Sequence, residues 1–212
     1  MRKLKNTSFM AMLVVCAPPF FIAVSIASTL VASEYNSLSD TMSRLSRPNM
    51  SHPWIFQLAV IGYAFLILPL GPLLYSRTKL IWQGILLWTL VLIYSLTGIL
   101  AAIFKDGDYT IILGNFTEDE FHGFIARLSF STIIVLIMCC IWIFRHNERW
   151  RMWRRLSLLL TLLAITLVIP FQLETWPHYM GLIQRIIFVC TMIWVFVTAI
   201  MLRQPSHQNE NI

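Results

Sequence analysis

The sequence predicts an all-α integral membrane protein, a bundle of six transmembrane helices with both termini in the cytoplasm. Of its 212 residues, 58% are hydrophobic and only 12% are charged, whereas soluble domains carry roughly 25% charged residues. The mean hydropathy is +0.71. A chain with so little charge cannot cover the surface of a water-soluble fold. The composition therefore excludes most soluble enzymes, nucleic-acid-binding proteins and disordered proteins.

Six apolar segments are long enough to cross a bilayer, because about 20 helical residues span its hydrocarbon core of roughly 30 Å. Backbone groups inside lipid must be hydrogen-bonded within their own segment, which predicts helices rather than isolated strands. The spans are expected near residues 9–31, 54–75, 80–104, 121–144, 156–173 and 179–202. We expect one domain over residues 1–203, followed by a polar, disordered tail at residues 204–212.

The first span begins after a basic segment, Arg2-Lys3-Leu4-Lys5, as a signal peptide also would. Its apolar run over residues 9–31 is longer than the usual signal core of about 7–15 residues, so we expect an uncleaved anchor. The pair Pro18-Pro19 removes two backbone donors and predicts a kink in this helix.

Capping residues mark the starts of the second and fourth spans. Ser51 or His52 can cap the second helix, with Pro53 in its first turn, where a missing N–H has no cost. Thr117 and Glu120 have the spacing of a capping box before the fourth span. The acidic residues there also favour the positive end of the helix dipole. The fifth span is the shortest and carries Pro170 near its end.

The positions of the charges predict the orientation, because cytoplasmic loops of membrane proteins are enriched in Lys and Arg. With the N-terminus inside, most basic residues fall on the cytoplasmic side: Arg2, Lys3, Lys5, Arg77, Lys79, Arg145, Arg149, Arg151, Arg154, Arg155 and Arg203. Most acidic residues then fall outside: Glu34, Asp40, Asp106, Asp108, Glu118, Asp119, Glu120 and Glu174. The chain is therefore expected to be N-in and C-in, and its basic surplus to mark the cytoplasmic face.

The cysteines and histidines predict no cofactor and no metal. All four cysteines lie inside predicted spans, without CxxC or CxxCH spacing: Cys16, Cys139, Cys140 and Cys190. This distribution is typical of small buried residues rather than of disulfides or haem attachment. His52, His122 and His178 are of a suitable ligand type for a metal, but no HxxxH or HExxH spacing supports a site.

Two residues at the predicted outer face could do acid–base chemistry. Asp106 follows the third span and His122 opens the fourth. Ionisable residues at a membrane span are by default a functional hypothesis, and this pair is the catalytic candidate. A nucleophile could come from the serines of the first outer loop, although no elbow motif selects one: Ser39, Ser43, Ser46 and Ser51.

Two arginines inside spans, with two histidines at the same end, are the candidates for ligand binding. Arg127 lies about 7 Å below His122 and Arg185 about 10 Å below His178, at 1.5 Å per residue. Their guanidinium groups suit a phosphate or carboxylate, with His52 and His178 nearby. The alternative is structural, since a long arginine side chain near a span end can snorkel or pair with an acid.

Four short motifs occur in an order that is similar to a known family. They are Tyr35–Ser43 (YNSLSDTMS), Ile103–Asp106 (IFKD), Glu120–Gly123 (EFHG) and Gly181–Arg185 (GLIQR). Over residues 9–202 the chain resembles the bacterial and archaeal "domain of unknown function 998" family of polytopic membrane proteins. The resemblance implies the fold and the membrane location, and it points to Asp106, His122 and Arg185. The chain departs from the family pattern in two places. At Arg44-Leu45-Ser46 the family often has a glycine after the leucine of the first-loop motif, and at Lys105 it often has a proline.

Three functions follow as hypotheses. In the first, the outer polar cluster binds a membrane-lipid headgroup or another small anion. In the second, a membrane-embedded hydrolase acts on a lipid at the outer leaflet with Asp106 and His122 as acid–base groups. In the third, the chain transports a small solute, which the missing internal repeat and the missing mid-span charge disfavour. The expected location is the cell membrane, in bacteria the inner membrane, with membrane lipids and not nucleic acid as partners.

Overall fold

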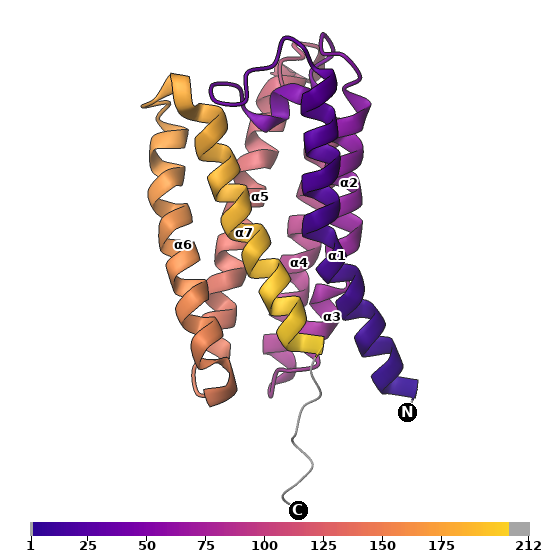
Figure 1. The fold of residues 1–212 in the computed structure, drawn as a ribbon, viewed down its shortest axis with the longest axis vertical. Coiled ribbons are helices and arrows are strands. Elements are labelled where there is room, and N and C mark those ends of the chain that lie inside the picture. The colour runs from indigo at the N-terminus through magenta and orange to yellow at the C-terminus, as the bar shows by residue number, and fades with distance from the viewer. Residues whose placement is uncertain (1, 204–212) are drawn as a thin grey trace, which may run out of the picture.

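The computed structural model describes residues 2–203 as a bundle of long helices that run side by side (Figure 1). In this part of the chain, six helical segments are long and apolar enough to cross a membrane: Thr7–Val31, Trp54–Tyr75, Ile81–Ile103, Glu118–Ile143, Glu148–Gln172 and Pro177–Arg203. The predicted all-α bundle of six spans is confirmed. The expected tail at 204–212 lies outside the described residues.

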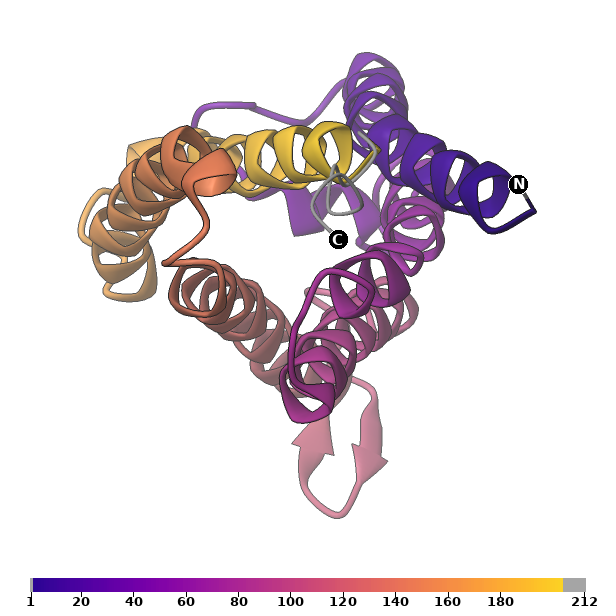
Figure 2. The same ribbon diagram turned by 90° about the horizontal axis from the view of Figure 1, so that it is seen from below.

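The helices pack mainly against their neighbours along the chain. They are α1 (Arg2–Val31), η1 (Met42–Ser46), α2 (Trp54–Ile67), α3 (Leu70–Tyr75), α4 (Ile81–Ile103), α5 (Glu118–Ile143), η2 (Glu148–Trp150), α6 (Arg151–Gln172), η3 (Pro177–Tyr179) and α7 (Met180–Arg203). The closest pairs are α4 with α5, α1 with α2, and α6 with α7, while α5 and α6 touch sparsely. Seen along the bundle, the long helices form a ring (Figure 2).

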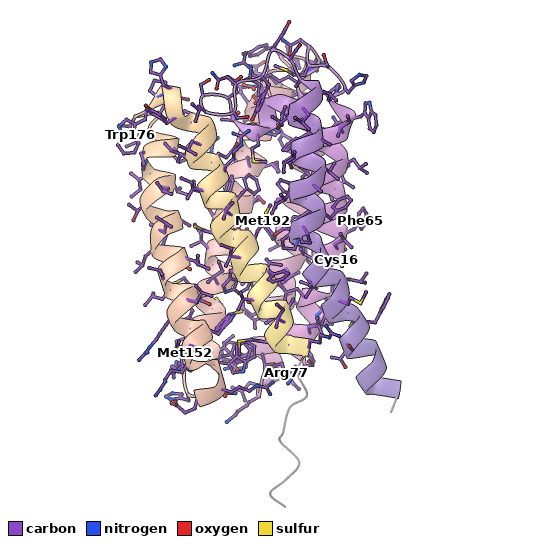
Figure 3. The ribbon with its side chains drawn as sticks, viewed as in Figure 1. Cys16, Phe65, Arg77, Met152, Trp176 and Met192 are labelled. Atoms are coloured by element: carbon purple, nitrogen blue, oxygen red, sulfur yellow. The ribbon has the colours of Figure 1, made fainter. Side chains whose placement is uncertain are left out.

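The two ends of the bundle differ in charge. One end, called the acidic end, carries the connections 32–53, 104–117 and 173–179, and most of the acidic residues lie there: Glu34, Asp40, Asp106, Asp108, Glu118, Asp119, Glu120 and Glu174. The opposite end, called the basic end, carries the first and the last described residues and the connections 76–80 and 144–147 (Figure 1). Large apolar side chains project from the periphery, Met152 near the basic end and Trp176 at the acidic end (Figure 3).

The predicted capping box of α5 is confirmed. The Thr117 hydroxyl accepts a hydrogen bond from the Glu120 N–H at 3.2 Å, and the Glu120 carboxylate accepts one from the Thr117 N–H at 3.0 Å. These two bonds satisfy N–H groups that would otherwise be orphaned at a helix start. The helix therefore begins at Glu118, three residues before the predicted span.

Two other boundaries differ from the prediction. No side chain caps α2 at Ser51 or His52, because Pro53 occupies the N-cap position. The helix of the fifth span, α6, begins at Arg151 instead of residue 156, because the turn η2 leads directly into it. Basic residues at 151, 154 and 155, expected in a loop, therefore lie on the first turns of α6.

The prolines act differently in the first two spans. Helix α1 continues through Pro18 and Pro19, and its axis changes direction near the middle, in agreement with the predicted kink (Figure 1). The second span is instead divided at Leu68 and Pro69 into α2 and α3. Pro69 has no N–H to continue the ladder, so the helix stops and restarts.

A short β-hairpin, which was not predicted, connects α4 to α5. Strand β1 (Ile111–Leu113) pairs antiparallel with β2 (Phe116–Thr117). Gly114 supplies the left-handed backbone of the turn, with φ of +60°. The sequence signal was present, because a Gly-Asn pair between two apolar stretches is typical of a hairpin.

Candidate functional site

A cavity of about 490 Å³ lies inside the bundle toward the acidic end, and all six spans contribute to its wall. Its size is within the range of small-molecule sites. The polar part of the wall includes Ser43, Arg47, Asp106, His122, Arg127 and Gln184. The apolar part includes Phe21, Phe56, Val60, Ile67, Phe130 and Phe188. The cavity thus offers polar groups and a large aromatic and aliphatic surface to one ligand.

His122 is the fifth residue of α5 and is buried, with 8% of its surface exposed. Its Nδ1 is 2.8 Å from the carbonyl oxygen of Phe104, the residue that ends α4. Because a carbonyl only accepts, Nδ1 carries the proton in this bond. In the neutral ring Nε2 is then an acceptor, available to a ligand or to a transferred proton.

Asp106 is half-buried and has both carboxylate oxygens occupied. Oδ1 accepts a hydrogen bond from Arg47 at 3.0 Å, and Oδ2 accepts one from the Ser43 hydroxyl at 3.0 Å. Burial alone would raise the pKa of Asp106, but the hydrogen bond and charge of Arg47, with smaller effects of His122 and Ser43, hold it below its ordinary value. Asp106 is therefore an ionised carboxylate that ties η1 to the end of α4.

A second set of contacts ties the first connection to α7. Arg185 Nη1 donates to the carbonyl of Ser37 at 2.6 Å and to that of Gly181 at 3.0 Å, and Nη2 donates to the Tyr35 hydroxyl. The guanidinium carbon lies 5.4 Å from the centre of the Tyr35 ring, in cation–π range. Gln184 accepts a hydrogen bond from the Met42 N–H. Arg185 thus holds the connection that covers the cavity.

Arg127 differs from the other arginines at this end. It lines the cavity, and within residues 2–203 no hydrogen bond or ion pair forms at its guanidinium. Its Nη1 is 3.7 Å from the position that a Cβ on Gly123 would occupy, one turn nearer the start of α5. The exposed guanidinium is therefore directed back along α5 toward the acidic end.

Two aromatic residues line the cavity from α2 and α4. The rings of Tyr63 and Tyr94 are 6.4 Å apart and perpendicular to one another. Tyr63 is buried, and its hydroxyl has no hydrogen-bond partner within the described part of the chain. A polar atom thus lies among the apolar groups of the wall.

The structure brings three of the six candidate residues together and separates the others. Asp106, His122 and Arg127 line one cavity, whereas His52, His178 and Arg185 are outside its lining. His52 and His178 are exposed in the connections at the acidic end. Among the residues the structure describes, no group of three or more His, Cys, Asp or Glu side chains is placed to hold a metal ion.

Sequence reasoning missed several residues of the site. The sequence patterns assign no role to Arg47, and Gln184 enters only as part of the motif Gly181–Arg185. Ser43 was one of four equivalent serines. Arg47 could have been suspected as a site residue because it lies in the same connection as Ser43. Nothing in the local sequence indicates that Arg47 pairs with Asp106, about 60 residues later.

Comparison with protein families supports this architecture. A family model described as "Protein of unknown function (DUF998)" matches residues 15–201. Neither the search of curated proteins nor that of solved structures gave a match. The matched segment includes four of the six spans in full, most of the first and the last, and every residue of the polar wall named above. The chain therefore belongs to the DUF998 family, and it is a multi-pass membrane protein.

Proposed function

We propose that this protein binds the anionic headgroup of a membrane lipid in the cavity at the acidic end, with Arg127 as the main contact. One observation carries the proposal: Arg127 is a permanent cation, exposed but on the lining of a cavity between membrane-spanning helices, and no described residue forms an ion pair with it. Charged groups in a span are costly and usually have a counter-charge. A phosphate or carboxylate would supply it and match the guanidinium fork.

The rest of the cavity favours an amphiphile over a free anion. Apolar and aromatic side chains line much of the wall, including Phe130 on α5 and Phe188 on α7. Their rings contact one another at 5.2 Å. An acyl chain would bury apolar surface against these groups, whereas inorganic phosphate would leave them unused. His122 Nε2 is a further polar contact for the headgroup.

The proposed orientation places the acidic end outside the cytoplasm. The basic end carries most of the lysines and arginines, both in the connections and in the first turns of α6. By the positive-inside rule this end faces the cytoplasm. The ligand would then come from the outer leaflet, in bacteria that of the inner membrane.

Lipid titration tests the proposal. The detergent-purified protein is titrated with short-chain phosphatidylglycerol, phosphatidylcholine or inorganic phosphate, and bound molecules are counted by native mass spectrometry. We expect phosphatidylglycerol to bind tightest. Arg127→Gln removes charge-assisted hydrogen bonds of about 1.5–3 kcal/mol and should weaken its binding by roughly 10-fold or more. Arg155→Gln is the matched control, because Arg155 is an exposed arginine of α6 outside the cavity lining.

Two results would contradict the proposal. If Arg127→Gln binds phosphatidylglycerol as tightly as wild type and Arg155→Gln do, Arg127 is not the contact. If inorganic phosphate binds as tightly as phosphatidylglycerol and depends on Arg127, the ligand is a free anion and the acyl chain contributes nothing.

Hydrolysis of a lipid ester in the same cavity is the second candidate. It is favoured by one observation: the Ser43 hydroxyl donates to Asp106, and His122 lies in the same wall. The lowered pKa of Asp106 makes it a weak base at neutral pH, so His122 Nε2 would have to accept the serine proton. Release of fatty acid from phosphatidylglycerol, absent in both Ser43→Ala and His122→Ala, would support this function; no release by the wild type would exclude it for that lipid.

A further inference from the structure

The hairpin at residues 109–117 exposes an apolar surface. Tyr109, Ile111 and Phe116 expose 75%, 66% and 57% of their surface. No charged residue occurs between Tyr109 and Thr117. An exposed, uncharged hairpin of this kind would be a site of aggregation in water, and two strands alone are marginally stable there.

The hairpin is placed where two spans end. It follows α4, whose last residue is Ile103, and precedes α5, whose first residue is Glu118. Figure 2 shows the two strands extending sideways past the ring of helices. The hairpin is therefore beside the bundle at the depth where the apolar spans meet the headgroups.

Hydrogen bonds at the base of the hairpin fix its direction. The Asp119 carboxylate accepts a bond from the Gly107 N–H at 2.7 Å, and the Asp119 N–H donates to the Asp108 carbonyl at 2.9 Å. The Glu118 N–H donates to the Thr110 carbonyl at 3.0 Å. The acidic residues are thus confined to the base, next to the bundle, and the part that extends outward is apolar or neutral.

We infer that the hairpin docks on the lipid surface at the acidic end and inserts Ile111 and Phe116 into the headgroup region. Aromatic and apolar side chains are favoured at that depth, where one side is wet and the other apolar. Beside the hairpin, Ile103 at the end of α4 and Phe124 near the start of α5 expose 54% and 53% of their surface, on helices that are apolar and long enough to cross a membrane. Lipid is therefore the occupant that the position of the hairpin indicates. Tyr109 also lines the cavity, but Ile111 and Phe116, which the inference concerns, lie outside that lining, so the inference does not depend on the proposed ligand.

Spin-label accessibility in lipid nanodiscs tests the inference on the full chain. Cys16 and Cys139 are replaced by Ala, while Cys140 and Cys190, which are buried, stay in place. Single cysteines are then introduced at exposed positions in the hairpin (Ile111→Cys, Phe116→Cys) and, as a control, in the first connection of the same end (Glu34→Cys). All three are labelled, and collision with oxygen is compared with collision with a water-soluble nickel chelate.

We expect labels at 111 and 116 to collide more with oxygen and at least severalfold less with the chelate than the label at 34. Equal collision with the chelate at all three positions would overturn the inference. Dipolar coupling between labels of two chains in one nanodisc would also overturn it, because the surface would then contact a second copy. The Cys16 and Cys139 replacements lie far from the hairpin in sequence, and the unlabelled protein in each background is checked for an unchanged thermal transition.

Discussion

Gly181 on α7 is the position where one methyl group should loosen the cover of the cavity. A Cβ built at Gly181 would collide with the backbone carbonyl oxygen of Asp40 and would lie 2.7 Å from that of Ser37. Both atoms are backbone, so they cannot rotate away as a side chain would. Gly181→Ala must therefore push the first connection off α7, together with the bonds that Arg185 makes to it.

The expected loss follows from overpacking, which costs about 1–3 kcal/mol in well-packed sites. For a chain of this size, that corresponds to a Tm lower by about 2–12 °C. Gly98→Ala is the matched control, because the nearest atom to its Cβ is the Ala64 methyl at 3.8 Å, an ordinary contact. Gly98→Ala should leave Tm unchanged or slightly higher, since alanine is the better helix former.

The measurement is thermal unfolding of both variants in the same detergent, followed by tryptophan fluorescence. The lipid titration described above is repeated for Gly181→Ala and wild type only, because Gly98 lines the cavity, and we expect Gly181→Ala to bind phosphatidylglycerol more weakly. If Gly181→Ala melts at the same temperature as Gly98→Ala and wild type, the connection does not pack on α7 as described, and the reasoning is refuted.

Three further predictions follow. Because the pKa of folded Asp106 lies below its ordinary value, its ionised form stabilises the protein above about pH 4, and this contribution is lost as the pH falls through the folded-state pKa. The Tm of Asp106→Asn should therefore depend less on pH between 3 and 5 than the Tm of the wild type does. The same pH dependence in both proteins would contradict this prediction. Tyr63→Phe removes a buried hydroxyl that forms no hydrogen bond within residues 2–203 and should keep or raise Tm; a fall of more than a few degrees would show that the hydroxyl is bonded, with the neighbouring Tyr94 as the candidate partner. Cysteines at the exposed positions Glu34 and His146 should react with an impermeant reagent from opposite sides of the membrane, with Glu34→Cys labelled from outside; the reverse would establish N-out.

Helix boundaries were predictable where a local signal fixes them. The Thr117–Glu120 capping box marks the start of α5, because both partners are three residues apart. The apolar segment predicts a start of α6 that is too late, because the arginines at 151, 154 and 155 are typical of a loop. Basic residues lower hydropathy without preventing helix formation, since arginine is a good helix former.

The sequence by itself determined the class of the protein, its six spans and the polar residues gathered at one end. These are properties of composition and of apolar runs of about 20 residues, which depend only on neighbours along the chain. Only the tertiary structure decided what the two arginines inside spans do. Arg185 donates hydrogen bonds to a connection about 145 residues away, whereas Arg127, which looks equivalent in sequence, lines the cavity and forms no hydrogen bond or ion pair within residues 2–203. The difference arises from how each helix is rotated against its neighbours, and no local pattern encodes that rotation.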